Sequence, residues 1–146
     1  MEADKLRLLL VEDIPINMEL EKLVFERGDF EVTPVTGGQD ALQQLELSDF
    51  DVVILDIKLP DMNGLDVVRW IRQNPRLKNL PVVAITALAM KGDREHALEC
   101  GFNAYITKPI DTRTLAETIW EIVKNLRETE EDQEPDESEG YEGNIS

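Results

Sequence analysis

The stretch Val52-Val53-Ile54-Leu55-Asp56-Ile57-Lys58-Leu59-Pro60-Asp61-Met62-Asn63-Gly64 decides the fold of this chain. Its first four residues are all apolar, which is typical of a central parallel strand that is covered on both faces. Proline fixes φ and Asn-Gly favours a turn, so residues 60–64 are predicted to form a loop. A helix is expected over residues 65–74, and it should stop before Pro75 because proline disfavours helical geometry in the preceding residue.

Strand-like and helix-like segments alternate on both sides of this stretch. We expect strands over residues 6–11, 30–35, 52–55, 82–86 and 104–107. Helices are expected from Pro15 to Gly28, around 41–47, over 65–74 and 89–100, and from a cap at Asp111 to Leu126. In the first helix, the apolar side is assigned to Met18, Leu20, Leu23 and Val24. Five βα units with right-handed crossovers predict an α/β fold, a doubly wound parallel sheet with helices on both faces.

Four of the predicted strands end in polar residues of the kind that handle phosphate. Glu12 and Asp13 follow the first strand, Asp56 the third, Thr86 closes the fourth, and Lys108 follows the fifth. Ligands bind beyond the carboxyl ends of the strands in an open parallel sheet, so these side chains are expected to converge. Singly, each residue could serve as a turn, cap or surface residue. Their agreement at four strand ends favours Mg²⁺-assisted phosphoryl chemistry.

The chemistry follows from the three carboxylates. Two unit charges about 4 Å apart cost roughly 4 kcal/mol at an effective dielectric constant near 20. A divalent cation offsets that cost, and hard oxygen ligands select Mg²⁺ or Ca²⁺ over zinc. Asp56 is the best nucleophile, because a carboxylate can attack phosphorus to form an acyl phosphate. Lys108 and Thr86 could pair with the other phosphoryl oxygens.

Composition narrows the class of protein. A hydrophobic content of 42% over 146 residues suits one folded domain, and the lone Cys100 excludes an internal disulfide framework and favours a reducing compartment. The charged N-terminus is unlike a signal peptide and the apolar runs are too short for a membrane span, so we expect a cytoplasmic location. The net charge of −16 argues against direct binding to nucleic acid.

Residues 6–126 resemble the receiver domain of two-component response regulators. The matching motifs are LLVED at 9–13, VILDIKLPDMNG at 53–64, AITA at 84–87 and YITKP at 105–109. The resemblance implies a flavodoxin-like (βα)5 fold with strand order 2-1-3-4-5, and a signalling switch rather than an enzyme. It is closest to stand-alone and hybrid-kinase receivers. Ile14 departs from the Asn often found there, so metal affinity or dephosphorylation rate could differ.

The resemblance also implies how the site works. Asp56 would accept a phosphoryl group from the histidine of a histidine kinase or a histidine phosphotransfer protein. Asp13, Asp56 and the backbone carbonyl of Lys58 would bind Mg²⁺, with Glu12 acting partly through water. Lys108 would contact the phosphoryl group, and its peptide bond to the following proline is expected to be cis.

Thr86 and Tyr105 resemble the switch pair of the same family. The phosphoryl group would draw the Thr86 hydroxyl inward, and Tyr105 would rotate into the vacated space. This changes a protein-binding surface around the fourth and fifth strands and the helix between them, which a downstream protein target would read. The resemblance also allows a dimer that forms on phosphorylation.

Three other classes of protein fit this sequence less well. A haloacid-dehalogenase-like phosphatase needs a second Asp two residues after the nucleophile, and Lys58 stands there. A flavodoxin-like cofactor binder needs glycines and hydroxyls after the first strand, where residues 12–15 would instead repel phosphate. A pseudo-receiver that only binds proteins is disfavoured by the intact acid, Thr and Lys set.

We expect a receiver domain over residues 1–126 and an acidic, disordered tail over residues 127–146. This tail holds nine of the 31 acidic residues and one of the 15 basic residues, a net charge of −8. It is either a solvating terminus or a tether that competes for a basic partner surface. No output domain accompanies the receiver pattern, so the protein is expected to act through protein partners.

Overall fold

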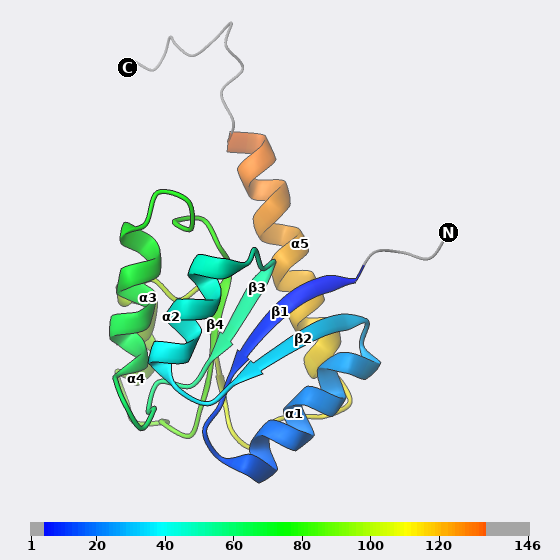
Figure 1. Cartoon of the computed structure of the whole chain (residues 1–146). Coiled ribbons are helices and arrows are strands. Elements are labelled where there is room, and N and C mark those ends of the chain that lie inside the picture. The colour runs from blue at the N-terminus through cyan, green and yellow to red at the C-terminus, as the bar shows by residue number, and fades with distance from the viewer. Residues whose placement is uncertain (1–4, 134–146) are drawn as a thin grey trace, which may run out of the picture.

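A five-stranded parallel sheet with helices on both faces forms the body of the molecule (Figure 1). This computed structural model describes residues 5–133. The strands are β1 (Leu6–Val11), β2 (Phe30–Val35), β3 (Val52–Leu55), β4 (Val82–Thr86) and β5 (Ala104–Thr107). The helices are α1 (Pro15–Arg27), α2 (Gly38–Leu47), α3 (Gly64–Gln73), α4 (Asp93–Cys100) and α5 (Leu115–Gln133). The strand order is β2-β1-β3-β4-β5, so the predicted fold class and order are confirmed.

Alternation along the strands divides the core into two layers. Successive strand residues point to opposite faces, so Leu8 and Leu10 of β1 face one layer while Leu9 and Val11 face the other. The first layer packs against α1 and α5, and the second packs against α2, α3 and α4. All four residues of β3 are buried, as expected for a central strand. Because all neighbouring strands pair in parallel, every strand ends at the same edge of the sheet, the lower one in Figure 1.

Two predicted helix boundaries are wrong by four residues or more. Helix α4 begins at Asp93 rather than at residue 89, because Gly92 has a φ of +93°, outside the helical region. Helix α5 continues beyond Leu126 to Gln133, so the predicted end of this helix at Leu126 is wrong. Its apolar repeat stops at Leu126, but glutamates are good helix formers and need no apolar face when exposed. The rest of the predicted tail lies outside the described residues.

Although α5 is the longest helix, neither it nor any other helix within residues 5–133 is long and apolar enough to cross a membrane.

The predicted apolar side of α1 is also partly wrong. Leu20 and Leu23 are 42% and 46% exposed, whereas the fully buried residues of this helix are Glu21 and Phe25. Met18 and Val24 pack partly against the core as expected. The observed buried face of α1 is thus rotated about the helix axis from the predicted one, which leaves apolar side chains on the outer surface of the helix.

One partly buried side chain, that of Arg72, connects α3 to the structure around it. The Arg72 guanidinium donates to the carbonyls of Gly101, Lys78 and Leu80 at 2.9, 3.0 and 2.7 Å, and to Asn103 Oδ1 at 2.8 Å. Burial lowers the pKa of Arg72. This single residue therefore joins the end of α4 to the loop between α3 and β4.

Candidate functional site

Two neighbouring strands bring three carboxylates together at the carboxyl edge of the sheet. Glu12 and Asp13 follow β1, and Asp56 follows β3, whose backbone ladder to β1 continues through a 3.3 Å bond from the Asp56 N–H to the Val11 carbonyl. One oxygen from each of the three carboxylates lies within 4.8 Å of the others. Glu12 and Asp56 are only 1% and 6% exposed. Water therefore screens their repulsion weakly.

Lys108 reaches this cluster from the end of β5. Its backbone N–H donates to the Thr86 carbonyl at 2.9 Å, which fixes the start of the side chain. Its ammonium lies 2.8 Å from Glu12 Oε1 and 3.0 Å from Asp56 Oδ2. Burial would lower the pKa of Lys108, but the hydrogen bonds to these two carboxylates outweigh it and raise the pKa above its usual value. The peptide bond to Pro109 is cis, as expected.

Thr86 and Tyr105 both contact Leu88, which follows β4. The Thr86 hydroxyl oxygen accepts a hydrogen bond from the Leu88 N–H at 3.3 Å, and the Tyr105 hydroxyl donates to the Leu88 carbonyl. Thr86 is 1% exposed and the ring of Tyr105 is buried. The predicted switch pair thus shares one residue, although the two side chains come from adjacent strands.

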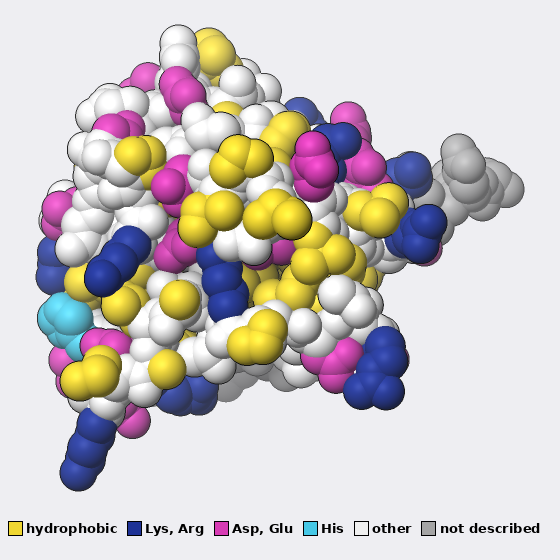
Figure 2. Space-filling view, turned by 90° about the horizontal axis from the view of Figure 1, so that it is seen from below, with side chains coloured by type: hydrophobic (Ala, Val, Ile, Leu, Met, Phe, Trp, Pro, Cys, Tyr) yellow, Lys and Arg dark blue, Asp and Glu magenta, His cyan; other side chains and the backbone are white. Residues whose placement is uncertain are grey.

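Five of the seven predicted site residues, all except Glu12 and Tyr105, border one cavity of about 450 Å³. Its lining consists of Asp13, Ile14, Asn17, Asp56, Lys58, Thr86, Ala87, Leu88 and Lys108. The backbone N–H of Lys58 donates to Asp56 Oδ1 at 3.2 Å, which orients the carboxylate. Figure 2 looks onto this edge of the sheet and shows acidic and basic side chains gathered near its middle, with hydrophobic side chains around them.

Sequence reasoning missed Glu21, a fourth carboxyl group beside the site. It lies on the inner side of α1 and is 3% exposed. Burial, followed by the charge of Glu12, raises the pKa of Glu21 to about 8. Its position four residues before the buried Phe25 was a usable signal, because residues at this spacing share one face of a helix.

Three comparisons with known proteins agree on the relatives of this chain. A family model for the response regulator receiver domain matches residues 8–120. The polar-differentiation response regulator DivK of Brucella ovis is 38% identical over 111 residues, which span 76% of this chain and 90% of that protein.

Solved structures give the same result. The signal receiver domain of a putative Luxo repressor protein from Vibrio parahaemolyticus superposes with a TM-score of 0.79 at 30% identity, over 90% of this chain and 99% of that one. The receiver domain of sensor histidine kinase PA1611 from Pseudomonas aeruginosa PAO1 gives a TM-score of 0.76 at 31% identity, over 82% and 98% of the two chains. That structure holds a magnesium ion in its active site cleft.

Proposed function

Because this chain belongs to the response regulator receiver family, we propose that it is a switch that accepts a phosphoryl group on Asp56. The donor is a phosphohistidine of a histidine kinase or of a histidine phosphotransfer protein. The observation that carries the proposal is the ammonium of Lys108, 3.0 Å from Asp56 and 2.8 Å from Glu12. A cation at this position can pair with an oxygen of a phosphoryl group on Asp56.

The transfer needs little covalent chemistry from the protein. An Asp56 oxygen attacks phosphorus, the new O–P bond forms as the N–P bond to the donor histidine breaks, and the histidine nitrogen keeps the electron pair. Lys108 offsets charge on one phosphoryl oxygen, and the Thr86 hydroxyl donates to another. Water later hydrolyses the acyl phosphate, so the protein resets itself and acts as a switch rather than as an enzyme with a separate substrate.

The residues of this cluster fit a bound Mg²⁺. Their donor atoms are hard carboxylate oxygens within 4.8 Å of one another, and among residues 5–129 the cluster forms ion pairs with Lys108 alone. Asp13, Asp56 and the Lys58 carbonyl would hold the ion directly, with Glu12 partly through water. When bound, the ion neutralises negative charge on the transferring oxygens.

Leu88 is the residue through which the switch would act. Its N–H is bonded to Thr86 and its carbonyl to Tyr105, so movement of the Thr86 hydroxyl toward the phosphoryl group releases one of its two restraints. The surface that changes is the one around β4, β5 and α4. We expect Tyr105→Ala to abolish the phosphorylation-dependent part of target affinity, measured by calorimetry. Tyr105→Phe keeps the ring and removes the hydroxyl bonded to Leu88, so it separates the two contributions of this side chain. Unchanged dependence in Tyr105→Ala would contradict the switch role.

Partners are expected to be proteins. Ile16, Leu20 and Leu23 leave apolar surface on α1 beside the site, where a phosphodonor protein could dock. The net charge of −16 argues against nucleic acid as a partner. A donor kinase that works on the cytoplasmic side would place this chain in the cytoplasm, and the family allows a dimer that forms on phosphorylation.

The test is intact-mass spectrometry after incubation with acetyl phosphate and Mg²⁺. We expect one added phosphoryl group on the wild-type chain, and none on Asp56→Asn or in the presence of EDTA. Asp66→Asn is the matched control, because this exposed carboxylate lies on α3 away from the cluster and pairs with Arg69 at 2.9 Å. If small donors and purified phosphohistidine proteins all fail to modify the wild type, the proposal is wrong and the pseudo-receiver interpretation replaces it.

A further inference from the structure

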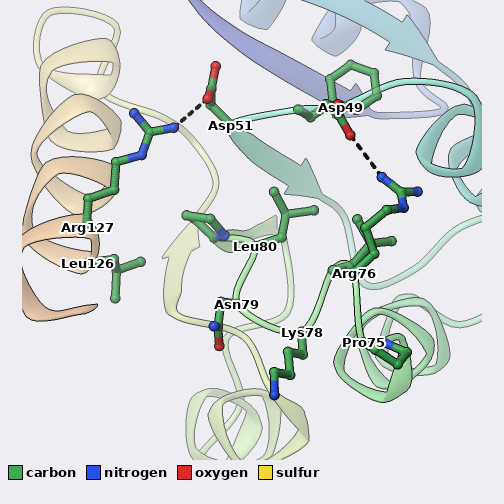
Figure 3. Close-up of a pocket in the computed structure, with 12 residues that line it drawn as sticks. Asp49, Asp51, Pro75, Arg76, Lys78, Asn79, Leu80, Leu126 and Arg127 are labelled. Atoms are coloured by element: carbon green, nitrogen blue, oxygen red, sulfur yellow. Dashed lines mark hydrogen bonds and ion pairs between the residues drawn. The ribbon is translucent and has the colours of Figure 1, made fainter. Parts of the chain in front are cut away.

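A second hollow lies at the amino edge of the sheet, opposite the phosphoryl site (Figure 3). Its volume is about 340 Å³, near the lower end of the about 300–1,000 Å³ usual for ligand pockets. Three segments form it: residues 49–51 before β3, the loop 75–81 between α3 and β4, and Leu126 with Arg127 of α5. No residue of the carboxyl-edge site lines it.

The lining of this hollow carries a different charge balance from the rest of the molecule. It contains three cations, Arg76, Lys78 and Arg127, and two carboxylates, Asp49 and Asp51, which leaves a net charge of +1. The whole chain carries −16. A local positive site on so acidic a protein favours an acidic ligand and limits where that ligand can bind.

The three cations remain available to a ligand. Arg76 pairs with Asp49 at 2.9 Å, but that carboxylate is 90% exposed, and Arg127 pairs with Asp51 while half exposed. Exposed pairs of this kind contribute only about 0–1 kcal/mol, and a guanidinium has donors for a second carboxylate. Lys78 forms no ion pair among residues 5–129, and Figure 3 shows its side chain extended away from both carboxylates.

The floor of the hollow is apolar. Leu77 is buried, and Phe50 and Leu80 are partly buried against the same core layer. Pro75 and Pro81 complete the walls. An apolar floor under a cationic rim suits an aromatic side chain flanked by carboxylates, because the ring can lie on the floor and also beside a guanidinium.

We propose that this hollow binds residues 139–142 of the same chain, Glu139-Gly140-Tyr141-Glu142. Tyr141 is the one aromatic residue in the sequence after Arg127, and glutamates flank it on both sides. Its ring occupies the apolar floor, and the carboxylates of Glu139 and Glu142 meet the cationic rim of Arg76 and Lys78. The contact uses no residue of the carboxyl-edge site.

The geometry of α5 makes this contact reachable. Arg127 lines the hollow, and the helix continues for six residues to Gln133, a rise of about 9 Å. Tyr141 follows eight residues later, and eight residues can span up to about 26 Å. The segment can therefore double back to the hollow. Attachment to the same molecule gives it an effective concentration in the millimolar range, about what a weak electrostatic contact needs.

The test uses the full chain with a nitroxide label attached at Asn144→Cys in a Cys100→Ser background. In ¹⁵N-labelled protein, we expect the amide signals of Lys78 and Asn79 to lose at least half their intensity relative to the reduced label. The amides of Ile14 and Thr86, at the opposite edge, should keep theirs. Lys78→Glu and Tyr141→Ser should each restore the lost intensity, whereas Lys91→Glu, an exposed charge reversal elsewhere, should not.

Two outcomes overturn the proposal. Undiminished signals at Lys78 and Asn79 mean that the segment does not reach the hollow. Loss of signal from an unlabelled ¹⁵N chain mixed with spin-labelled ¹⁴N chain means that the occupant belongs to a second copy. Both results are independent of whether Asp56 accepts a phosphoryl group.

Discussion

The two halves of the carboxyl edge differ in how firmly the protein holds them. In the charge half, formed by residues 12–13, 56–64 and 108, Glu12 and Asp56 are buried and Lys108 bonds to both. In the response half, formed by residues 86–92 and 105, Thr86 is buried but the following loop opens, with Met90 75% exposed. A Cβ added at Gly92 would meet no atom within 4 Å. Charge is therefore held where packing is tight, and the response can occur where packing is loose.

The largest effect on stability is expected when the cation of the charge half, Lys108, is removed. Lys108→Met leaves two buried carboxylates without their ion-pair partner, so we expect the free energy of unfolding to fall by about 3–5 kcal/mol at pH 7. Lys91→Met, an exposed lysine of the response half, should change it by less than about 0.5 kcal/mol. Urea unfolding followed by circular dichroism in EDTA measures both, and equal effects would show that the halves do not differ.

Two glycines, Gly64 in the charge half and Gly92 in the response half, compare the packing of the two halves directly. A Cβ at Gly64 would lie 2.6 Å from the Asp56 carbonyl oxygen and 2.8 Å from Ile57 Cα, both backbone atoms. We expect Gly64→Ala to destabilise the fold by about 2–3 kcal/mol. Gly92→Ala meets no atom but keeps a φ of +93°, which costs about 1 kcal/mol. In thermal unfolding, the midpoint of Gly64→Ala should therefore fall further below that of the wild type than the midpoint of Gly92→Ala does.

Glu21 predicts a dependence of stability on pH. Its pKa rises to about 8 in the folded protein, so the proton that it keeps contributes stability below pH 4.5, and that stability is lost as pH rises through about 8. At about 1.36 kcal/mol per pKa unit, discounted for relaxation, Glu21→Gln should be more stable than wild type at pH 9 by on the order of 2 kcal/mol. The difference should vanish near pH 4, measured in EDTA. The exposed Glu19→Gln is the control on the same helix, and a parallel pH profile in Glu21→Gln would refute the assignment.

The smallest expected effect on stability comes from Asp61, a carboxylate in the loop of the charge half. Asp61 accepts hydrogen bonds from the N–H groups of Gly38 and Gln39 at 2.8 and 2.9 Å, so it caps α2 from the loop after β3. These bonds lower the pKa of Asp61, and the stability they contribute is present above its usual pKa and lost as pH falls through the lowered one. Asp61→Ala should cost about 1 kcal/mol at pH 7, and Asp61→Asn less. Hydrogen exchange at the Gly38 amide reports the loss directly.

The elements of this fold differ in how clearly the sequence encodes them. Buried strands carry strong apolar runs, so β3 and the sheet order could be predicted, and the strand ends then located Asp56 and Lys108. Apolar periodicity predicted the wrong buried face for α1, because the buried carboxyl group of Glu21 interrupts the apolar pattern on the face that packs against the core. The end of α5 was missed for the opposite reason, since glutamates are good helix formers and extend a helix without any apolar signal. The start of α4 depended on the positive φ of Gly92, which composition does not reveal.

The hydrogen bonds of Arg72 have a thermodynamic consequence. This side chain holds Gly101, at the end of α4, and also Lys78 and Leu80, in the loop that walls the amino-edge hollow. If phosphorylation shifts α4, the shift changes the affinity of that hollow for its ligand. Binding free energies are reciprocal, so occupancy of the hollow then changes the free energy of phosphorylation at Asp56 by the same amount. The two edges of the sheet would respond as one allosteric unit, with Arg72 as the residue whose removal uncouples them.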